Sequence, residues 1–284
     1  MMSKHDVRLA PVDPHHLPAL DDDDARRPAE APRGGDLREA IDELHDRLRE
    51  RQALLAADGR RALLVVLQGR DTSGKDGTIR DVFSACNPQG CRVTAFAAPG
   101  PLELRHDYLW RVHTAVPPRG TIGIFNRSHY EDVLVARVRG LVSEEVWSRR
   151  YRHIVEFERM LVDEGTIVLK FFLHISHAEQ AKRLRERLTE SEKNWKFDEK
   201  DLEDRLRWNA YTLAYQDAFR ETSTDWAPWY VVPADHKKTR NLLVAQTIVN
   251  ALESVDLRPP QLPAGKLESL QTALDAQLRA ESVE

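Results

Sequence analysis

The fold is decided by residues 62–82, which read ALLVVLQGRDTSGKDGTIRDV. The first six residues are a continuous apolar run with two valines, the pattern of a strand buried on both faces of a parallel sheet. Residues 69–75 follow directly and match the phosphate-binding pattern G-x-x-x-x-G-K, and residues 76–85 are expected to form a helix. In this strand–loop–helix setting, backbone N–H groups converge on phosphate oxygens and the helix N-terminus favours negative charge. We therefore expect a phosphate site here rather than an ordinary glycine turn.

Apolar runs and helical patterns continue to alternate on both sides of this stretch. Asp36 and Glu39 are expected to form a capping box at the start of the first helix, and Gly59 is expected to end it. This alternation predicts an α/β fold, a P-loop kinase-like, mostly parallel sheet with helices on both faces and a helical lid. The further strands are expected over residues 92–97, 121–125, 167–175 and 229–232, and the helices over residues 36–58, 102–114, 143–164, 177–189, 199–221 and 242–252.

The chain divides into three parts by composition. Residues 1–35 are rich in Pro, Asp and Arg and lack periodic apolar residues, so we expect a flexible arm or surface wrap, with residues 21–24 as a solvated acidic tail. Residues 36–254 are expected to form one P-loop domain, with a lid at about residues 177–207. The remainder, residues 255–284, is expected to be a polar C-terminal tail.

The 284 residues carry 42 Lys and Arg against 46 Asp and Glu, a formal net charge of −4. This mild acidity argues against general adhesion to nucleic acid or anionic lipid, although it is compatible with a local basic channel. Two cysteines in a chain of this length fit a reducing compartment. The N-terminus shows no signal-peptide core, and the apolar runs are too short to span a bilayer. We therefore expect a cytoplasmic protein without nucleic-acid or membrane partners.

Two residues of the glycine-rich loop carry its expected chemistry. Lys75 can reach a bridging or terminal phosphate. Ser or Thr normally follows this lysine and helps to hold magnesium, but Asp-Gly-Thr follows it here. We therefore expect Asp71 to be the metal ligand, directly or through water, because Mg²⁺ favours oxygen donors and keeps several waters. Asp76 has an alternative interpretation as an ordinary carboxylate in the first turn of a helix.

A dense polar string, residues 126–132 with the sequence NRSHYED, follows the third expected strand. P-loop enzymes place a second acidic element at the carboxyl end of a neighbouring strand, close to the phosphate cradle. Arg127 could stabilise the transferred phosphoryl charge, and either Glu131 or Asp132 could hold metal. The alternative is a polar loop that only covers the sheet edge. His129 could form a phosphohistidine, but we favour a structural histidine.

Basic residues mix with aromatic ones over residues 182–197. P-loop kinases place a mobile lid at this point of the chain, and arginine forks grip phosphate oxygens bidentately. We expect Arg183 and Arg187 to act in such a lid, which would exclude water during transfer. The alternative is a solvated charged helix with salt bridges to nearby glutamates.

Several long motifs, in order along the chain, resemble the polyphosphate kinase 2 family. The similarity spans about residues 36–253 and implies Mg²⁺-dependent transfer of a phosphoryl group between inorganic polyphosphate and a nucleotide, by a homo-oligomer. Many members have Asp-Arg-Ser after the strand that corresponds to residues 121–125, whereas this chain has Asn126, Arg127 and Ser128 there. This version resembles the subgroup able to phosphorylate AMP as well as ADP. The motifs are residues 67–77, 87–90 (NPQG), 107–111 (DYLWR), 125–132 and 227–231 (APWYV).

The residue patterns and the resemblance together predict a role for each site residue. Catalytic roles are predicted for Asp71, Lys75, Arg127 and Glu131. Binding of phosphate or polyphosphate is predicted for Gly69, Arg70, Thr72, Ser73, Gly74, Lys75, Asp76, Gly77, Arg80, Arg183, Arg187, Lys193 and Lys196. Nucleotide binding is predicted for Asn126, Arg127 and Glu131. Metal binding, with Mg²⁺ first and Mn²⁺ as the other candidate, is predicted for Asp71, Glu131 and Asp132.

The predicted partners are inorganic polyphosphate and adenine or guanine nucleotides. Two other functions share the same cradle. One is an ATP-dependent nucleoside-monophosphate kinase, which the choice of phosphoryl donor would distinguish. The other is a nucleotide-binding switch without turnover, which would show ligand-dependent stability but no phosphorylated product.

Overall fold

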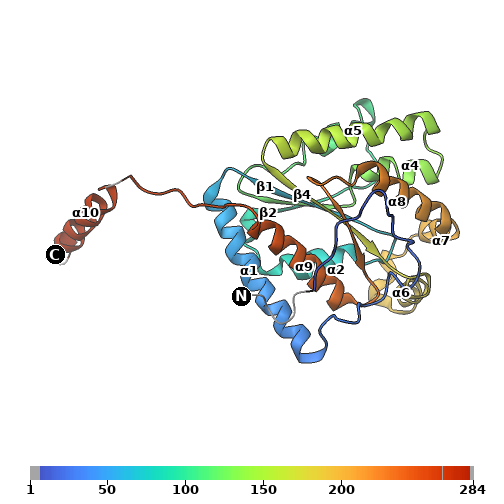
Figure 1. Cartoon of the computed structure of the whole chain (residues 1–284), viewed down its shortest axis with the longest axis horizontal. Coiled ribbons are helices and arrows are strands. Elements are labelled where there is room, and N and C mark those ends of the chain that lie inside the picture. The colour runs from blue at the N-terminus through green and yellow to red at the C-terminus, as the bar shows by residue number, and fades with distance from the viewer. Residues whose placement is uncertain (1–6, 264, 282–284) are drawn as a thin grey trace.

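A computed structural model describes residues 7–263 and 265–281, and a five-stranded sheet lies at its centre (Figure 1). The strand order is β2-β3-β1-β4-β5, and every neighbouring pair is parallel. β1 is central and buried at all 7 positions, as its continuous apolar run predicts. The predicted parallel sheet is confirmed. Its strands are β1 (Ala62–Gln68), β2 (Cys91–Ala95), β3 (Ile122–Asn126), β4 (Thr166–His174) and β5 (Trp229–Pro233).

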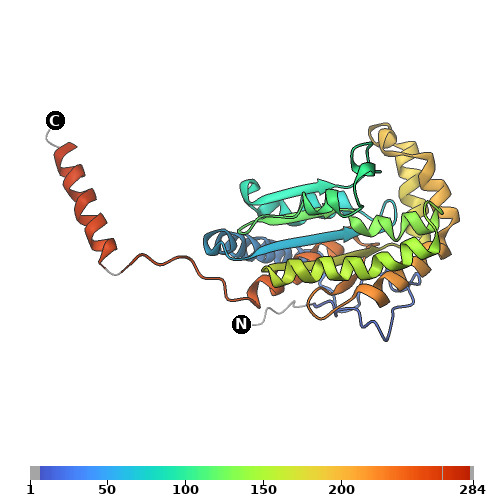
Figure 2. The same ribbon diagram turned by 90° about the horizontal axis from the view of Figure 1, so that it is seen from above.

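Helices cover both faces of the sheet, which confirms the predicted α/β class. One face packs against α1 (Gly34–Asp58), α2 (Lys75–Val82) and α9 (Lys237–Glu253). The other face packs against α5 (Glu144–Asp163) and α8 (Trp208–Thr222), with the short α3 (Trp110–His113) and α4 (Val135–Val138) nearby. After β4, α6 (His177–Thr189) and α7 (Glu199–Leu206) project beyond the carboxyl edge of the sheet (Figure 2).

All strands run in the same direction, so their carboxyl ends meet at one edge of the sheet. Leu67 of β1 pairs with Asn126 of β3 and with Phe171 of β4, and His174 of β4 pairs with Pro233 of β5. The loops that follow β1, β3, β4 and β5 therefore gather at this edge. Open α/β sheets bind their ligands in this position.

The helix predicted over residues 102–114 is wrong as a single element. Only a 3₁₀ turn (Glu103–Arg105) and α3 form there. Asp107 lies between them, and its Oδ1 accepts the N–H of Leu109 at 3.0 Å. Local bonds of this kind compete with the helical ladder and favour a turn.

Two further helix predictions are also corrected. α1 begins earlier than predicted, with an extended Arg33 before it and no side-chain cap, so the capping box of Asp36 and Glu39 is wrong. Asp36 lies instead in the first turn, where its charge interacts favourably with the helix dipole. The helix predicted over residues 199–221 is two helices, because Arg207 between α7 and α8 has a non-helical backbone (φ −96°, ψ 25°).

The structure places residues 7–33 against the domain as an extended strap. The N–H of Val12 donates to the carbonyl oxygen of Trp229 at 2.8 Å. The carboxylate of Asp22 accepts the N–H of His177, at the start of α6, at 2.9 Å. Residues 7–33 therefore take the form of the expected surface wrap. The acidic run is largely exposed, as expected of a solvated segment, but Asp22 is tied to α6.

The C-terminal segment contains a helix that the expectation of a polar tail omits. α10 (Lys266–Glu281) stands away from the domain at the end of an extended connection (Figures 1 and 2). Its Leu267, Leu270 and Leu274 are about half exposed. Neither α10 nor any other helix in the described part of the chain is both long enough and apolar enough to cross a bilayer.

Candidate active site

The loop between β1 and α2 has the backbone that a phosphate cradle requires. Gly69, Thr72 and Gly74 have positive φ angles of 153°, 66° and 102°. The φ of Gly74 is one that residues with a Cβ rarely adopt, and a Cβ atom there would also displace the guanidinium of Arg240, so glycine is favoured at that position. The Thr72 hydroxyl is buried without a hydrogen-bond partner among the described residues. A phosphate oxygen could satisfy such a group.

Lys75 lies at the start of α2 and points back into this loop. Its Nζ donates to the carbonyl oxygens of Gly69 at 2.7 Å and Arg70 at 3.4 Å, and the residue is 8% exposed. The pKa of Lys75 is lowered to about 8, first by burial and then by the positive charge of Arg127. A phosphate oxygen could therefore take the place of these two carbonyl oxygens as the acceptor of the Lys75 ammonium group. Its negative charge would favour the protonated form of Lys75.

Arg127 joins the cradle to the loop that follows β3. Its Nη2 donates to Asp71 Oδ1 at 2.8 Å, and its Nη1 lies 3.7 Å from Glu131 Oε2. Burial raises the pKa of Glu131, an effect that the charge of Arg127 opposes. Beside it, Asn126 Nδ2 donates to Asp76 Oδ1 at 2.7 Å. The structure therefore brings together site residues that were predicted on two separate segments.

Asp132 belongs to a different charge cluster. Its carboxylate lies 3.5 Å from Arg150 Nη1 and 3.8 Å from Arg111 Nη2. Burial raises its pKa, and these two arginines oppose the shift. Within residues 7–263 and 265–281, no three His, Cys, Asp or Glu side chains form a metal-binding group. Of the predicted metal ligands, Asp71 and Glu131 flank Arg127, whereas Asp132 pairs with other arginines.

A carboxylate from the lid region, Asp201 on α7, also approaches Asp71. Its pKa is raised to about 6, first by burial and then by the negative charge of Asp71. Arg187 Nη1 donates to Asp201 Oδ2 at 2.8 Å. Nothing in the sequence distinguishes Asp201, because α7 also carries other acidic residues and only the packing of the helix shows which of them is buried.

Arg183 links α6 to the cradle. It is 6% exposed, and its guanidinium donates to the carbonyl oxygen of Thr72 at 3.0 Å. It also donates to the carbonyl oxygens of Ala234 and Asp235, at 2.9 and 2.8 Å, beyond the end of β5. Most of its hydrogen-bonding capacity is therefore used within the protein, which favours an anchoring role.

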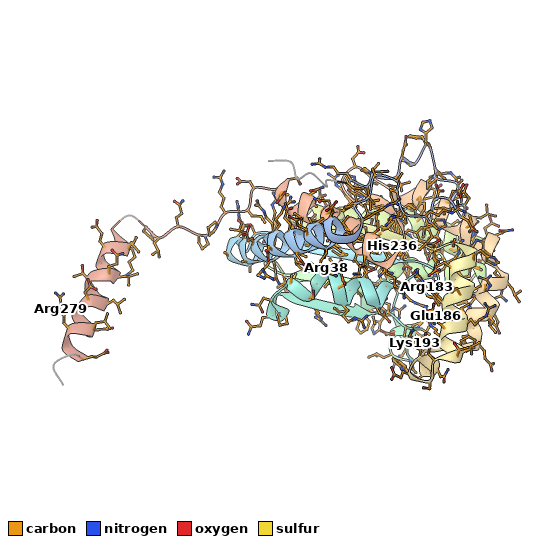
Figure 3. The ribbon with its side chains drawn as sticks, turned by 90° about the horizontal axis from the view of Figure 1, so that it is seen from below. Arg38, Arg183, Glu186, Lys193, His236 and Arg279 are labelled. Carbon is orange, nitrogen blue, oxygen red and sulfur yellow. The ribbon has the colours of Figure 1, made fainter. Side chains whose placement is uncertain are left out.

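The other basic residues predicted in the lid are less enclosed. Lys193 is half-buried and pairs with Glu190 at 2.6 Å, in the same region as Arg183 and Glu186 (Figure 3). The side chain of Lys196 lies outside the described residues.

Arg70 ties the cradle to α8. Its guanidinium carbon lies 3.9 Å from the ring centroid of Trp208, and Nη2 donates to Thr212 Oγ1 at 2.5 Å. Burial lowers the pKa of Arg70 to about 10.

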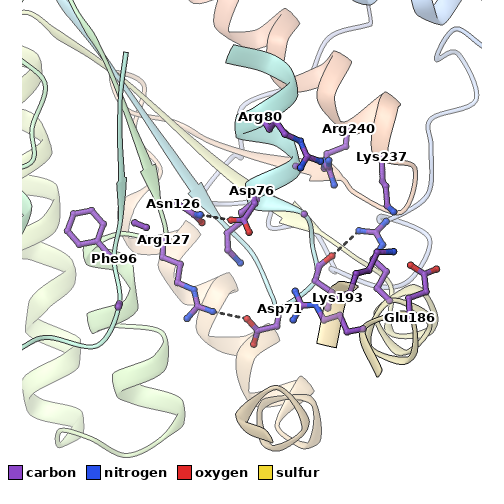
Figure 4. A pocket seen from close by; sticks show the side chains of 18 residues that line it. Asp71, Asp76, Arg80, Phe96, Asn126, Arg127, Glu186, Lys193, Lys237 and Arg240 are labelled. Atoms are coloured by element: carbon purple, nitrogen blue, oxygen red, sulfur yellow. Dashed lines mark hydrogen bonds and ion pairs between the residues drawn. The ribbon is translucent and has the colours of Figure 1, made fainter. Parts of the chain in front are cut away.

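A cavity of about 400 Å³ opens in front of the cradle (Figure 4). It is lined by 8 Lys and Arg side chains against 3 carboxylates. Lys237 and Arg240 of α9 are two of these cations, and neither was among the site residues predicted from the sequence. A signal was present, because the basic run KKTR at residues 237–240 follows the last strand at the same sheet edge. The charged lining residues are Asp71, Lys75, Asp76, Arg80, Arg127, Arg183, Glu186, Arg187, Lys193, Lys237 and Arg240.

A second cavity, of about 600 Å³, shares one wall with the first. Its lining has 5 Lys and Arg side chains against 6 carboxylates, together with apolar side chains such as Leu104 and Val135. Four residues line both cavities: Asp71, Phe96, Ala97 and Arg127. The two cavities therefore meet at the ion pair of Asp71 and Arg127.

His129 is fully buried beneath this site. Its Nε2 lies 3.2 Å from Glu158 Oε1, and its ring packs against Phe157 with centroids 5.9 Å apart. A phosphohistidine intermediate needs a ring nitrogen that reaches the substrate. The geometry therefore supports the structural interpretation of His129.

Comparison with known proteins decides the family. The family model described as Polyphosphate kinase 2 (PPK2) matches residues 35–260, which is most of the chain. The chain belongs to the polyphosphate kinase 2 family. This confirms the resemblance drawn from the motifs and the predicted enzyme class, a phosphotransferase.

Relatives of this polyphosphate kinase 2 include two bacterial enzymes with substrate-specific names. It is 57% identical over 223 residues to the AMP/ADP-polyphosphate phosphotransferase of Meiothermus ruber, a match that covers 78% of this chain and 84% of that protein. It is 46% identical over 239 residues to the ADP-polyphosphate phosphotransferase of Rhodopseudomonas palustris, covering 80% and 83%. The crystal structure of polyphosphate kinase 2 from Arthrobacter aurescens TC1 is similar with a TM-score of 0.87 at 36% identity, covering 95% and 99%.

Proposed function

We propose that this polyphosphate kinase 2 transfers the terminal phosphoryl group of an inorganic polyphosphate chain to AMP or ADP. One observation carries the proposal: two cavities of different character meet at Asp71 and Arg127. One reactant can approach this junction from each side. The AMP/ADP-polyphosphate phosphotransferase named among the relatives supports the same pair of reactants.

The smaller cavity suits the polyphosphate chain. A polyphosphate carries negative charge along its whole length and offers no apolar surface, so it requires an excess of cations. The lining supplies 8 Lys and Arg side chains against 3 carboxylates, although the whole protein is mildly acidic. Lys75 and the cradle would hold the terminal phosphate, and Arg80, Lys193 and Lys237 would contact the chain behind it.

The larger cavity suits the nucleotide. A nucleotide combines an apolar base with a short charged end, so its site needs apolar surface and only a few charges. The lining provides Phe96, Leu104 and Leu141 together with nearly balanced charges. The phosphate end of AMP or ADP would then face Arg127, next to the terminal phosphate of the polymer.

The reaction is a direct in-line displacement. An oxygen of the nucleotide phosphate attacks the terminal phosphorus of the polymer, and the bond from that phosphorus to its bridging oxygen breaks. The bridging oxygen leaves with the polymer, which is shorter by one phosphate. The acceptor phosphate is already largely ionised at neutral pH, since its second pKa is about 6, so no strong general base is needed. Lys75 and Arg127 neutralise charge on the transferring group, and the two cavities align the reactants.

The carboxylates at the junction fit a divalent cation. Asp71 and Glu131 flank Arg127 and present oxygen donors, which Mg²⁺ and Mn²⁺ prefer. Mg²⁺ sites for phosphoryl transfer use one or two carboxylates together with substrate phosphates, so a group of three protein ligands is not required. We propose that Asp71 holds the cation, with Glu131 close to it. When bound, the cation would offset repulsion between the two anionic reactants.

Three finer parts of the proposal are the use of guanine nucleotides as acceptors, a homo-oligomeric assembly and a cytoplasmic location. The assembly is suggested by the family resemblance, and the location by the two cysteines and the short apolar runs of the sequence. Each can be tested separately without affecting the reaction proposed above.

The proposal is tested by the choice of phosphoryl donor. The purified protein is incubated with Mg²⁺, AMP and polyphosphate in the absence of ATP, and the nucleotides are separated by chromatography. We expect ADP, and then ATP, to form as polyphosphate shortens. Formation of ADP only when ATP replaces polyphosphate would instead identify a nucleoside-monophosphate kinase. Ligand-dependent stabilisation without any product would identify a nucleotide-binding switch.

A further inference from the structure

A buried ion pair lies directly behind the loop that carries Arg127. Lys170 of β4 and Glu158 of α5 are both fully buried, and Lys170 Nζ donates to Glu158 Oε2 at 2.6 Å. The same ammonium group donates to the hydroxyl of Tyr130 at 3.1 Å and to the carbonyl oxygen of Thr222 at 2.7 Å. All three protons of Lys170 therefore have acceptors inside the protein.

Stability alone is a weak explanation for this pair. Removing two charges from water is expensive, and replacing a buried ion pair with apolar residues of similar volume is often neutral or stabilising. Lys170 is the one charged side chain in β4, whose other positions from Leu169 to Leu173 are apolar and buried. Neither Glu158 nor Lys170 lines either of the two cavities assigned to the reactants, so the pair has no direct part in the proposed reaction.

Glu158 of this pair is connected to the active-site loop by two hydrogen bonds, in addition to the bond from Lys170 to Tyr130. Glu158 Oε1 accepts the hydroxyl of Tyr130 at 2.9 Å and contacts Nε2 of His129 at 3.2 Å. Both residues belong to the 3₁₀ turn η4 (His129–Asp132), which follows Arg127 and contains Glu131. Tyr130 is held further by an edge-on contact with the Trp229 ring, with centroids 4.6 Å apart.

The loop needs such a support because its backbone is strained. Arg127 has a φ of 61°, in the left-handed region that residues with a Cβ rarely adopt. A conformation of this kind persists only where the surroundings hold it, and it is common at active sites. On one side the N–H of Arg127 donates to the carbonyl oxygen of Leu67 at 3.0 Å. On the other side the hydrogen bonds from η4 to Glu158 hold the chain.

We propose that Glu158 and Lys170 form a positioning pair that fixes η4 from behind and so places Arg127 and Glu131 against the phosphate cradle. Glu158 binds the side chains of His129 and Tyr130 in η4. Lys170 hydrogen-bonds to Glu158 and Tyr130 and so fixes both to β4. Neither residue touches a reactant. The inference rests on the proposed function for its kinetic consequence, while its structural consequence can be measured without substrate.

The kinetic test uses two mild substitutions, Glu158→Gln and Tyr130→Phe. Both keep the side-chain shape, but Glu158→Gln leaves the buried Lys170 ammonium without a counter-charge and lowers stability, so each variant is assayed well below its own unfolding midpoint. We expect kcat to fall about tenfold in Glu158→Gln and severalfold in Tyr130→Phe, with the KM for polyphosphate unchanged within about twofold, because Arg127 is misplaced for the transition state while the cradle is intact. Tyr230→Phe is the matched control. It removes a hydroxyl of the same kind from the opposite face of the sheet, where Tyr230 stacks on Phe171, and kcat should stay within about twofold.

A second control separates positioning from general loss of stability. Leu48→Ala creates a cavity in the core on the α1 side, far from η4, and lowers the unfolding midpoint. Assayed well below that midpoint, it should keep the wild-type kcat. A fall of kcat in Leu48→Ala equal to that in Glu158→Gln would overturn the inference. So would a wild-type kcat in both folded variants, Glu158→Gln and Tyr130→Phe.

The structural test is amide hydrogen exchange of the loop. The N–H of Glu131 donates to the carbonyl oxygen of Ser128, and the N–H of Val133 donates to that of Tyr130, both at 3.0 Å. We expect faster exchange over residues 127–133 in Glu158→Gln than in the wild type or in Leu48→Ala. Unchanged exchange in this segment would contradict the inference. This measurement needs no substrate, so it stands even if the wild-type protein transfers no phosphate from polyphosphate, a result that would overturn only the proposed function.

Discussion

The pH dependence of the reaction should report the charge of Lys75. Burial and the nearby Arg127 lower its pKa to about 8, from an ordinary value of 10.5. Only the protonated ammonium can attract the terminal phosphate, so the free enzyme loses this contact as pH rises through 8. At pH 7 about nine tenths of the lysine is charged, and at pH 9 about one tenth. The kcat/KM for polyphosphate should therefore fall about tenfold between these pH values.

The assay is the initial rate of ADP formation from AMP at subsaturating polyphosphate, measured from pH 6.5 to 9.5. The acceptor phosphate is fully ionised over most of this range, so it adds little to the slope. The fall of kcat at saturating polyphosphate should come at higher pH, because bound phosphate raises the pKa of Lys75. Lys75→Arg is the control: its activity is lower, but the profile should be flat because arginine stays charged. A wild-type kcat/KM that is constant to pH 9.5, or the same fall in Lys75→Arg, would refute the reasoning.

The stability of the ligand-free protein should change in the opposite direction to activity. The pKa of Lys75 is lower in the folded state than in the unfolded state, so the unfolded chain binds more protons between pH 8 and 10.5. The contribution of Lys75 to the free energy of unfolding therefore rises with pH across this window. A loss of activity at pH 9 with an undiminished urea midpoint would separate lysine titration from unfolding.

Two further predictions concern the junction between the cavities. Arg127→Ala should lower kcat on the order of 10²–10³-fold, because a directed charge contact in the transition state is lost. A steady-state assay checks this, and a loss below about fivefold would show that Arg127 does not act in the reaction centre. Chelation with EDTA should abolish transfer, and Mg²⁺ should restore it more fully than Ca²⁺, which prefers more ligands and longer distances; full activity of the protein after exhaustive chelation would contradict the metal assignment at Asp71.

The sequence predicts the fold well where a physical signal is local. The apolar run of residues 62–67 marks a central buried strand because every position in β1 faces a packed layer. The cradle is predicted for a similar reason, because the buried strand, the glycines, the lysine and the following helix all lie within one short segment of the sequence. The helix over residues 102–114 fails because periodicity does not reveal the side-chain bond from Asp107 that breaks it.

The site is predicted less completely, because its parts come from distant segments. Asp71 and Arg127 are far apart in sequence and meet only because β1 and β3 are neighbours in the sheet. From the sequence, Arg183 is predicted to bind phosphate oxygens with both ends of its guanidinium. In the fold, this guanidinium donates to carbonyl oxygens of the cradle and of the segment after β5. Asp201 could not be found from sequence, because only the packing of α7 brings it to Asp71.

The measurement that tests the central claim most directly compares two KM values in two variants. Lys237→Ala removes a cation from the smaller cavity, and Leu104→Ala removes apolar surface from the larger one. We predict that Lys237→Ala raises the KM for polyphosphate severalfold and leaves the KM for AMP unchanged, and that Leu104→Ala does the reverse. If both KM values rose together in either variant, or if each variant affected the other reactant, the account of two separate cavities meeting at Asp71 and Arg127 would be contradicted.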